Sequence, residues 1–158
     1  MSFATLRAAF SGIGARVALR YLTVAAIANL GWEIVQLPLY TIWKAATPRE
    51  LADAIVHCTT GDVLLLTAAL SMSLLLVGER GWPVRGYVRA ALLATLLGIA
   101  HTIFSEWYNI EIRRSWAYVP AMPLLPLIGT GLSPLLQWVV IPPAVFILVK
   151  PRAGALRP

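Results

Sequence analysis

Four stretches of the 158-residue chain are long and apolar enough to be membrane-spanning helices. A span needs about 20 mostly apolar residues, because the hydrocarbon core of a bilayer is about 30 Å thick. The first stretch ends before Pro38. The last begins at Ser133 and Pro134, which suit a helix N-terminus because serine caps a backbone N–H and proline has none to satisfy. The predicted spans cover residues 17–37, 51–77, 88–108 and 133–149.

Residues 115–130 are also apolar, but Pro120, Pro123 and Pro126 recur at every third position. A straight helix does not tolerate this spacing, because each proline removes a backbone hydrogen bond. The spacing favours an extended, polyproline-II-like segment with few backbone hydrogen bonds. Such a backbone cannot face lipid, so we expect a re-entrant or interfacial segment on the outer side of an all-α, four-helix membrane bundle. A fifth span over these residues is the alternative.

The composition supports a membrane protein. Apolar residues make up 59% of the chain and charged residues 13%, against roughly 45–50% and about 25% in soluble domains. The mean hydropathy is +0.76. A soluble domain of this size could not bury so much apolar surface. The composition therefore excludes a soluble globular domain, a disordered tail and a nucleic-acid-binding module.

The basic residues predict the orientation of the chain. With the N-terminus in the cytoplasm, nine Lys and Arg residues fall inside and four fall outside, which is the bias that membrane proteins show. The inside set is Arg7, Arg16, Arg20, Arg80, Arg85, Arg89, Lys150, Arg152 and Arg157, and the outside set is Lys44, Arg49, Arg113 and Arg114. Four spans then place both termini in the cytoplasm. We expect a multi-pass protein of a bacterial-type inner membrane.

Five ionisable side chains fall in the outer halves of the predicted spans: Glu33, His57, Asp62, His101 and Glu106. Such groups cost a few kcal/mol each inside a membrane and usually mark a site or a pathway. We therefore predict that all five are catalytic residues. On the first helix, Asn29, Glu33 and Gln36 are spaced as i, i+4 and i+7, so they form one polar stripe.

The spacing of the histidines permits two crossed carboxylate–imidazole pairs. His57 precedes Asp62 by five residues, and His101 precedes Glu106 by five. Five residues correspond to about 7.5 Å of helix rise. On antiparallel neighbouring helices, His57 would lie level with Glu106, and Asp62 level with His101. Residues five apart also point about 140° apart around a helix, so these pairs require a wide cavity.

An acidic, basic and aromatic segment follows Glu106 at the predicted outer interface. One interpretation is an aromatic belt with snorkelling arginines. The other is a set of groups that fold over the cavity. On the second interpretation, the predicted substrate-binding residues are Asn29, Gln36, Asn109, Arg113, Arg114 and Trp116.

These residues suggest several functions. Buried carboxyl groups beside histidines are suited to general acid–base catalysis. The apolar surroundings favour a lipid-soluble substrate, such as an isoprenoid, sterol-like or acyl molecule. His57, His101, Asp62 and Glu106 are also enough ligands for a divalent metal such as Zn, Fe or Mn, although no HExxH motif is present.

Three further hypotheses remain open at this stage. Haem b held between His57 and His101 would make the protein an electron carrier. A transporter or channel is disfavoured, because the polar residues gather on one side of the membrane. In an accessory subunit of a larger membrane complex, the same polar residues would serve only as hydrogen bonds between helices.

Overall fold

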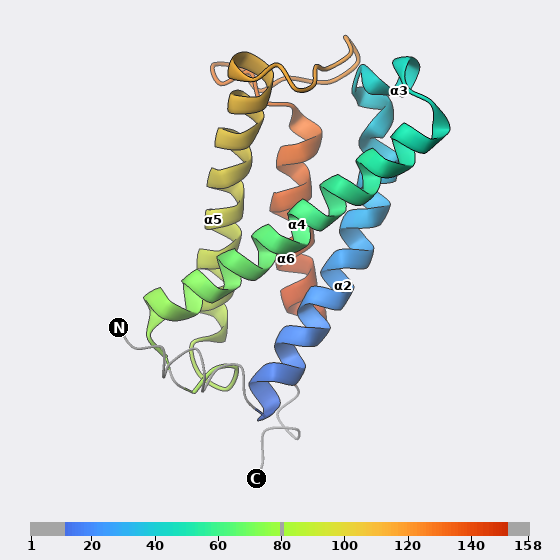
Figure 1. Ribbon diagram of the computed structural model, residues 1–158. Helices are drawn as coiled ribbons and strands as arrows, with labels where there is room; N and C mark the ends of the chain where they lie inside the picture. Colours follow the sequence, from blue (N-terminus) through green and yellow to red (C-terminus); the bar gives the residue numbers. More distant parts are fainter. Residues whose placement is uncertain (1–11, 80, 152–158) are drawn as a thin grey trace.

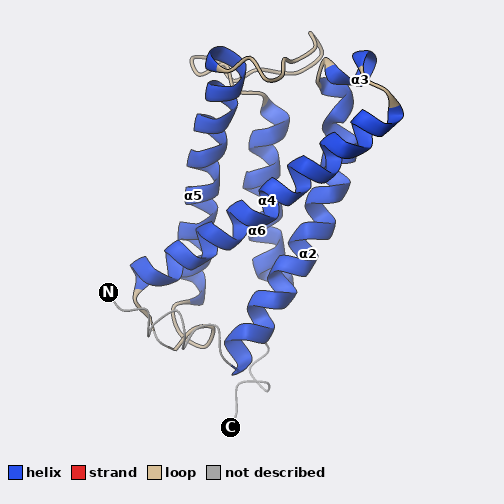
Figure 2. Cartoon of the chain, viewed as in Figure 1, coloured by secondary structure: helices blue, strands red, loops and turns tan. Residues whose placement is uncertain are grey.

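The computed structural model describes residues 12–79 and 81–151, and their regular structure is helical (Figure 2). The four long helices are α2 (Gly12–Gln36), α4 (Pro48–Val77), α5 (Tyr87–Trp107) and α6 (Leu132–Val149). The short elements are the 3-10 turn η1 (Leu37–Leu39), the one-turn helix α3 (Ile42–Ala45) and the π-helical turn η2 (Tyr108–Ile112).

The four predicted spans are confirmed as helices that are long and apolar enough to cross a membrane. The second helix begins earlier than predicted, at Pro48 rather than residue 51. Thr47 and Glu50 form a capping box there, in which each side chain accepts a hydrogen bond from the other residue's backbone N–H. The helix ends at Gly78, whose φ of 66° is the left-handed conformation that glycine adopts without strain.

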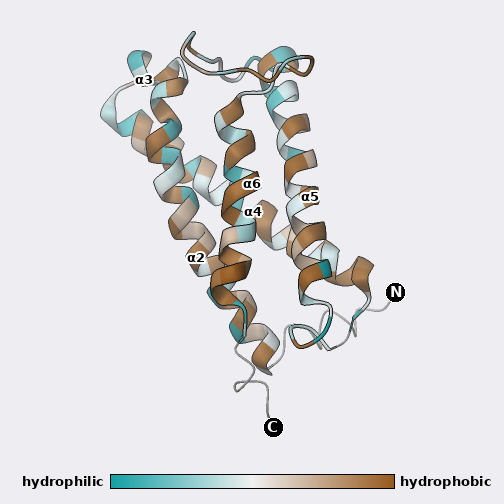
Figure 3. Cartoon of the chain, turned by 180° about the vertical axis from the view of Figure 1, so that it is seen from behind, coloured by the Kyte–Doolittle hydropathy of each residue, from teal (hydrophilic) through white to brown (hydrophobic). Residues whose placement is uncertain are grey.

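The long helices form a closed bundle in which α4 is the most strongly tilted. Helix α6 lies between α2 and α5, and α4 crosses in front of them on a diagonal (Figures 1 and 3). Both α4 and α6 pack against α2 and α5. All buried residues of α4 lie between Leu66 and Leu74. The first half of α4 therefore leaves the core, and its side chains are exposed or half-buried.

Hydrophobic residues run along all four long helices (Figure 3), and many of their large side chains are exposed. The exposed fraction is 67% for Leu19, 66% for Leu64, 62% for Leu96 and 76% for Ile147. Inside, α5 and α6 pack closely at Gly98, where an added Cβ would lie 2.0 Å from the Trp138 ring. Small residues of this kind allow neighbouring membrane helices to pack closely.

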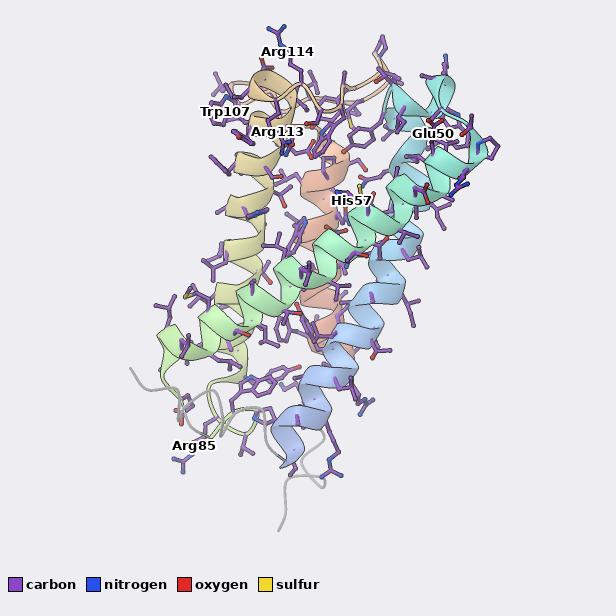
Figure 4. All side chains as sticks on the ribbon, viewed as in Figure 1. Glu50, His57, Arg85, Trp107, Arg113 and Arg114 are labelled. Atoms are coloured by element: carbon purple, nitrogen blue, oxygen red, sulfur yellow. The ribbon has the colours of Figure 1, made fainter. Side chains whose placement is uncertain are left out.

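The two ends of the bundle differ. The start of α2, the end of α6 and the turn after Gly78 lie at one end, which we call the Gly78 end (Figure 1). Helix α3 and the proline-rich segment lie at the other, which we call the α3 end. Arg85 lies at the Gly78 end, and Arg113 and Arg114 at the α3 end (Figure 4). Of the thirteen basic residues used for orientation, Arg7, Arg80, Arg152 and Arg157 lie outside the described residues.

The proline-rich segment, residues 115–130, contains no helix and crosses the α3 end of the bundle. Its position as an end segment agrees with the prediction, and the alternative of a fifth spanning helix is wrong. Its backbone makes a small number of hydrogen bonds, and two of them join it to the end of η1 and the turn before α3. The Thr41 N–H donates to the Ala117 carbonyl at 2.9 Å, and the Val119 N–H to the Leu39 carbonyl at 3.0 Å. Two isolated β-bridges, Tyr40–Tyr118 and Leu124–Gly131, hold the segment in place.

Candidate functional site

Polar side chains of three helices meet at Gln137 of α6. Its Nε2 atom donates to Asn29 Oδ1 at 2.7 Å and to Asp62 Oδ2 at 2.8 Å, and it lies 3.2 Å from Glu33 Oε1. Gln36 Nε2 donates to the same Glu33 oxygen at 2.8 Å. One amide of α6 therefore joins a polar stripe on α2 to a carboxyl group on α4.

The network extends toward the start of α6. Ser133 Oγ donates to Gln36 Oε1 at 2.9 Å, and the indole N–H of Trp32 donates to Ser133 Oγ at 3.3 Å. The carboxyl groups of Glu33 and Asp62 both accept from the Gln137 amide, so this one side chain links them. We call these groups the Gln137 network, and its members are Asn29, Trp32, Glu33, Gln36, Asp62, Ser133 and Gln137.

A second cluster forms at Glu106, near the end of α5. The Tyr118 hydroxyl donates to Glu106 Oε2 and accepts a hydrogen bond from the Gly131 N–H at 2.9 Å. The indole nitrogen of Trp116 is buried beside the Glu106 carboxyl. The proline-rich segment therefore supplies the groups that surround Glu106, and we call this the Glu106–Tyr118 pair.

Tyr40 lies between the two clusters. Its ring centroid is 5.4 Å from that of Tyr118. Burial raises the pKa of the Tyr40 phenol far above its usual value, and the neighbouring Glu106, Tyr118, Glu33 and Cys58 raise it further. Burial, followed by the charge of Glu106, likewise raises the pKa of Tyr118. Both phenols therefore keep their protons at neutral pH, and the Tyr118 phenol donates to Glu106.

An apolar groove runs between α2 and α4. Its volume is about 350 Å³, and it is lined by Leu30, Val56, Thr59, Thr60 and Val63. Leu30 and Val63 directly follow Asn29 and Asp62 of the Gln137 network in the chain. The groove has the size of a small-molecule pocket and lies on two helices that could span a membrane.

The structure brings together most of the predicted polar groups but not the histidines. Asn29, Glu33 and Gln36 are buried, at 2%, 7% and 4% exposed, and they share one network with Asp62. The predicted crossed carboxylate–imidazole pairs are wrong. His57 and His101 are exposed, and neither hydrogen-bonds to a carboxylate within the described residues.

The physical reason for this correction is the helix period. Glu106 and Asp62 face the bundle, so side chains five residues earlier point about 140° away, toward the outside. Within residues 12–79 and 81–151, no group of three or more His, Cys, Asp or Glu side chains is placed to hold a metal ion. The predicted ligand set of His57, His101, Asp62 and Glu106 is therefore not assembled. The exposed histidines also give no support to the haem b hypothesis.

The predicted substrate-binding residues of the outer segment separate into two groups. Trp116 is half-buried and lies beside Glu106. Asn109 instead bonds within its own helix, since its Nδ2 atom donates to the Ser105 carbonyl at 2.8 Å. Arg113 and Arg114 are exposed, and Arg114 points away from the bundle (Figure 4). Of the aromatic and basic groups after Glu106, Trp116 is thus the one predicted residue that reaches the site.

Five residues of the site were not predicted from the sequence: Trp32, Tyr40, Tyr118, Ser133 and Gln137. Gln137 carries a signal that could have identified it, because it is the one amide or charged side chain in the apolar α6. The two tyrosines lie outside regular periodic segments, so no pattern marks them. Comparison of the chain with protein-family models, curated proteins and solved structures found no match. The function must therefore follow from the chemistry of the site.

Proposed function

We propose that the protein is a multi-pass membrane enzyme that performs acid–base chemistry on a lipid-soluble substrate. The observation that carries the proposal is that three carboxyl groups from three different helices, Glu33, Asp62 and Glu106, are hydrogen-bonded within the α3 half of the bundle. Their hydrogen-bond partners within the described residues are amides and a phenol rather than cations. Ionisable groups held this way inside an apolar bundle are costly, and they usually serve a function.

Membrane insertion is supported by the outer surface of the bundle. Large apolar side chains are exposed along all four long helices, as a lipid-facing surface requires. We place the α3 end outside and the Gly78 end in the cytoplasm of a bacterial-type inner membrane, because the basic residues favour that orientation. The site then lies in the outer half of the membrane.

The chemistry that fits this site is proton transfer. Glu33 and Asp62 accept hydrogen bonds from the same amide, so one carboxyl can donate a proton to a substrate while the other accepts one. Gln137 holds both carboxyl groups in place. Tyr40 and Tyr118 add two protonated phenols that can donate hydrogen bonds to a substrate oxygen. Double-bond isomerisation, cyclisation and hydrolysis all need such paired acids and bases.

The apolar groove between α2 and α4 supports a lipid-soluble substrate. It would accommodate a hydrocarbon chain that enters sideways from the bilayer. Its lining residues Leu30 and Val63 lie at the same level of α2 and α4 as Asn29 and Asp62, so a chain bound there would lie at the depth of the Gln137 network. This route keeps the apolar part of the substrate out of water.

The test compares lipid extracts of cells that produce the wild-type protein, Asp62→Asn or no protein, by mass spectrometry. We expect the wild-type protein to convert at least one lipid-soluble species, and Asp62→Asn to abolish the conversion. Asp53→Asn is the matched control, because Asp53 is exposed on the same helix. If no lipid changes, or if Asp62→Asn converts it at the wild-type rate, the proposal is wrong.

An accessory subunit is the second candidate, because the Gln137 network also bonds three helices to one another. Such interhelical hydrogen bonds contribute about 0.6 kcal/mol each. This alternative predicts that Asp62→Asn lowers the thermal stability of the purified protein and changes no lipid. The enzyme proposal predicts a lost conversion in a protein that is still folded.

A further inference from the structure

A small cavity lies beside Glu106, on the side of η2 and the end of the proline-rich segment. Its volume is about 10 Å³, and its polar lining residues are Glu106, Glu111 and Thr130. A cavity of this volume holds about one water molecule, and a buried water needs two to four polar partners. The lining supplies two carboxyl groups and one hydroxyl group.

Thr130 indicates that this cavity is a polar site rather than a packing defect. The residue is 2% exposed, and its hydroxyl has no hydrogen-bond partner among the described residues. A buried polar group without a partner costs about 1–3 kcal/mol. Its backbone is fixed, because the Thr130 carbonyl accepts from the Leu125 N–H at 2.9 Å. A bridging water would satisfy this hydroxyl.

The π-helical turn η2 explains how two acidic residues line one cavity. Glu106 is 7% exposed, whereas Glu111 is exposed. In an α-helix, residues five apart point away from one another. In η2 the hydrogen bonds join residues five apart, as between the Arg113 N–H and the Tyr108 carbonyl at 2.8 Å. The wider turn brings Glu111, at the α3 end, to the same cavity as the buried Glu106.

We propose that this cavity binds a water molecule that relays protons between Glu111 at the surface and the buried Glu106 carboxyl. A proton from bulk water binds the Glu111 carboxylate, the cavity water accepts it, and the same water releases a proton to Glu106. The return transfer follows the same atoms in reverse, so no other reactant is needed. The inference rests on the proposed acid–base role of Glu106, and it adds the side of the bundle from which the site is supplied with protons.

The test measures hydrogen–deuterium exchange of the Glu106 carboxyl by infrared spectroscopy of the full-length protein in lipid nanodiscs. The carbonyl stretching band of protonated Glu106 is assigned by its loss in Glu106→Gln, at a pH where the carboxyl is protonated. After transfer to D₂O, we expect the wild-type band to shift quickly. Thr130→Val removes a partner of the water and should slow the shift about tenfold, as expected for one lost hydrogen bond.

Two further variants make the test specific. Thr130→Ser keeps the hydroxyl and should exchange at the wild-type rate. Thr67→Val is the matched control, because the Thr67 hydroxyl bonds to the Val63 carbonyl of its own helix at 2.7 Å. Glu111→Gln changes an exposed residue, so it tests the relay without altering the core, and it should also slow exchange.

An unchanged exchange rate in either Thr130→Val or Glu111→Gln would overturn the relay, as would a slowed rate in Thr67→Val. Exchange is measured without a lipid substrate, so its outcome is independent of the lipid comparison. A protein that exchanges as expected but converts no lipid would retain the relay and lose the proposed enzyme function.

Discussion

The two halves of the bundle use the same four helices in opposite ways. Toward the Gly78 end, aromatic rings fill the core. The ring centroids of Tyr21 and Phe146 are 4.3 Å apart, and those of Tyr87 and Phe146 are 5.7 Å apart in an edge-to-face arrangement. Toward the α3 end, amides and carboxyl groups bond across helices through Gln137. The Gly78 half is held together by the packing of aromatic rings, and the α3 half by hydrogen bonds between helices.

On the proposed function, the polar groups of the α3 half serve chemistry and the Gly78 half supplies packing. At the Gly78 end, the Tyr87 hydroxyl donates to the Phe146 backbone carbonyl at 2.6 Å. Buried charges add little to stability, and apolar replacements of similar volume are often as good or better. The proposed function would account for Glu33, Asp62 and Glu106 at the α3 end. Substitutions in the α3 half should therefore change mainly the rate of lipid conversion, and those in the Gly78 half mainly the stability.

The largest expected effect is on activity, from Glu33→Gln. Gln is nearly isosteric and still accepts the hydrogen bond from Gln36, but it cannot transfer a proton. General acid–base catalysis contributes about 10²–10⁴ in rate, so we expect a loss of that size with an unchanged melting temperature. The measurement is the initial rate of lipid conversion by purified protein. Glu79→Gln, next to Gly78 at the other end, is the control that should retain the rate.

Tyr118→Phe should have the second-largest effect. It removes the phenol that donates to Glu106 and leaves the Gly131 N–H without its acceptor. Hydrogen bonds to charged groups contribute about 1.5–3 kcal/mol, so the conversion rate should fall roughly tenfold to a hundredfold. Tyr108→Phe is the matched control, because Tyr108 is exposed and stacks on Phe104. Equal rates in the two variants would remove Tyr118 from the site.

Gly98→Ala tests the packing that both halves share. The added Cβ would lie 2.0 Å from the Trp138 ring, and such overpacking costs about 1–3 kcal/mol. We expect a lower melting temperature in detergent. Gly31→Ala has nothing within 4 Å of its Cβ and should be neutral or slightly stabilising, because alanine favours a helix more than glycine does. A melting temperature equal to that of Gly31→Ala would show that the helices separate easily at Gly98.

The sequence predicts the half of the site that lies on helices. Hydropathy locates four spans because each must cover the same membrane thickness. The stripe of Asn29, Glu33 and Gln36 follows from the helix period, and the structure buries all three. The same helix period indicates that His57 and His101 are not part of the site. They lie at the depth of the carboxyl groups in the bundle, but on another side of their helices. The position of a residue within a span predicts its depth in the membrane. Which side of the helix is buried depends on how the neighbouring helices pack.

The other half of the site could not be predicted, because it depends on an irregular segment. Tyr118 reaches Glu106 only because a β-bridge pairs it with Tyr40, far away in the chain. Nothing periodic marks such a pairing, since its hydrogen bonds run between two loops. Gln137 is a different case, because an amide in an apolar helix is a visible signal.

The smallest expected effects come from two tyrosine substitutions at the Gly78 end, which should change the free energy of unfolding in different directions. Tyr87→Phe removes the hydrogen bond to the Phe146 carbonyl and should lower the free energy of unfolding by about 0.5–1.5 kcal/mol. The Tyr21 hydroxyl is buried without a partner among the described residues. Tyr21→Phe should therefore leave that free energy unchanged or raise it, while the ring contact with Phe146 remains. Unfolding by denaturant in detergent measures both. If Tyr21→Phe destabilises the protein as much as Tyr87→Phe does, the Tyr21 hydroxyl has a polar partner. Hydrogen bonding at Tyr21 would then stabilise the Gly78 end in addition to the packing of its rings.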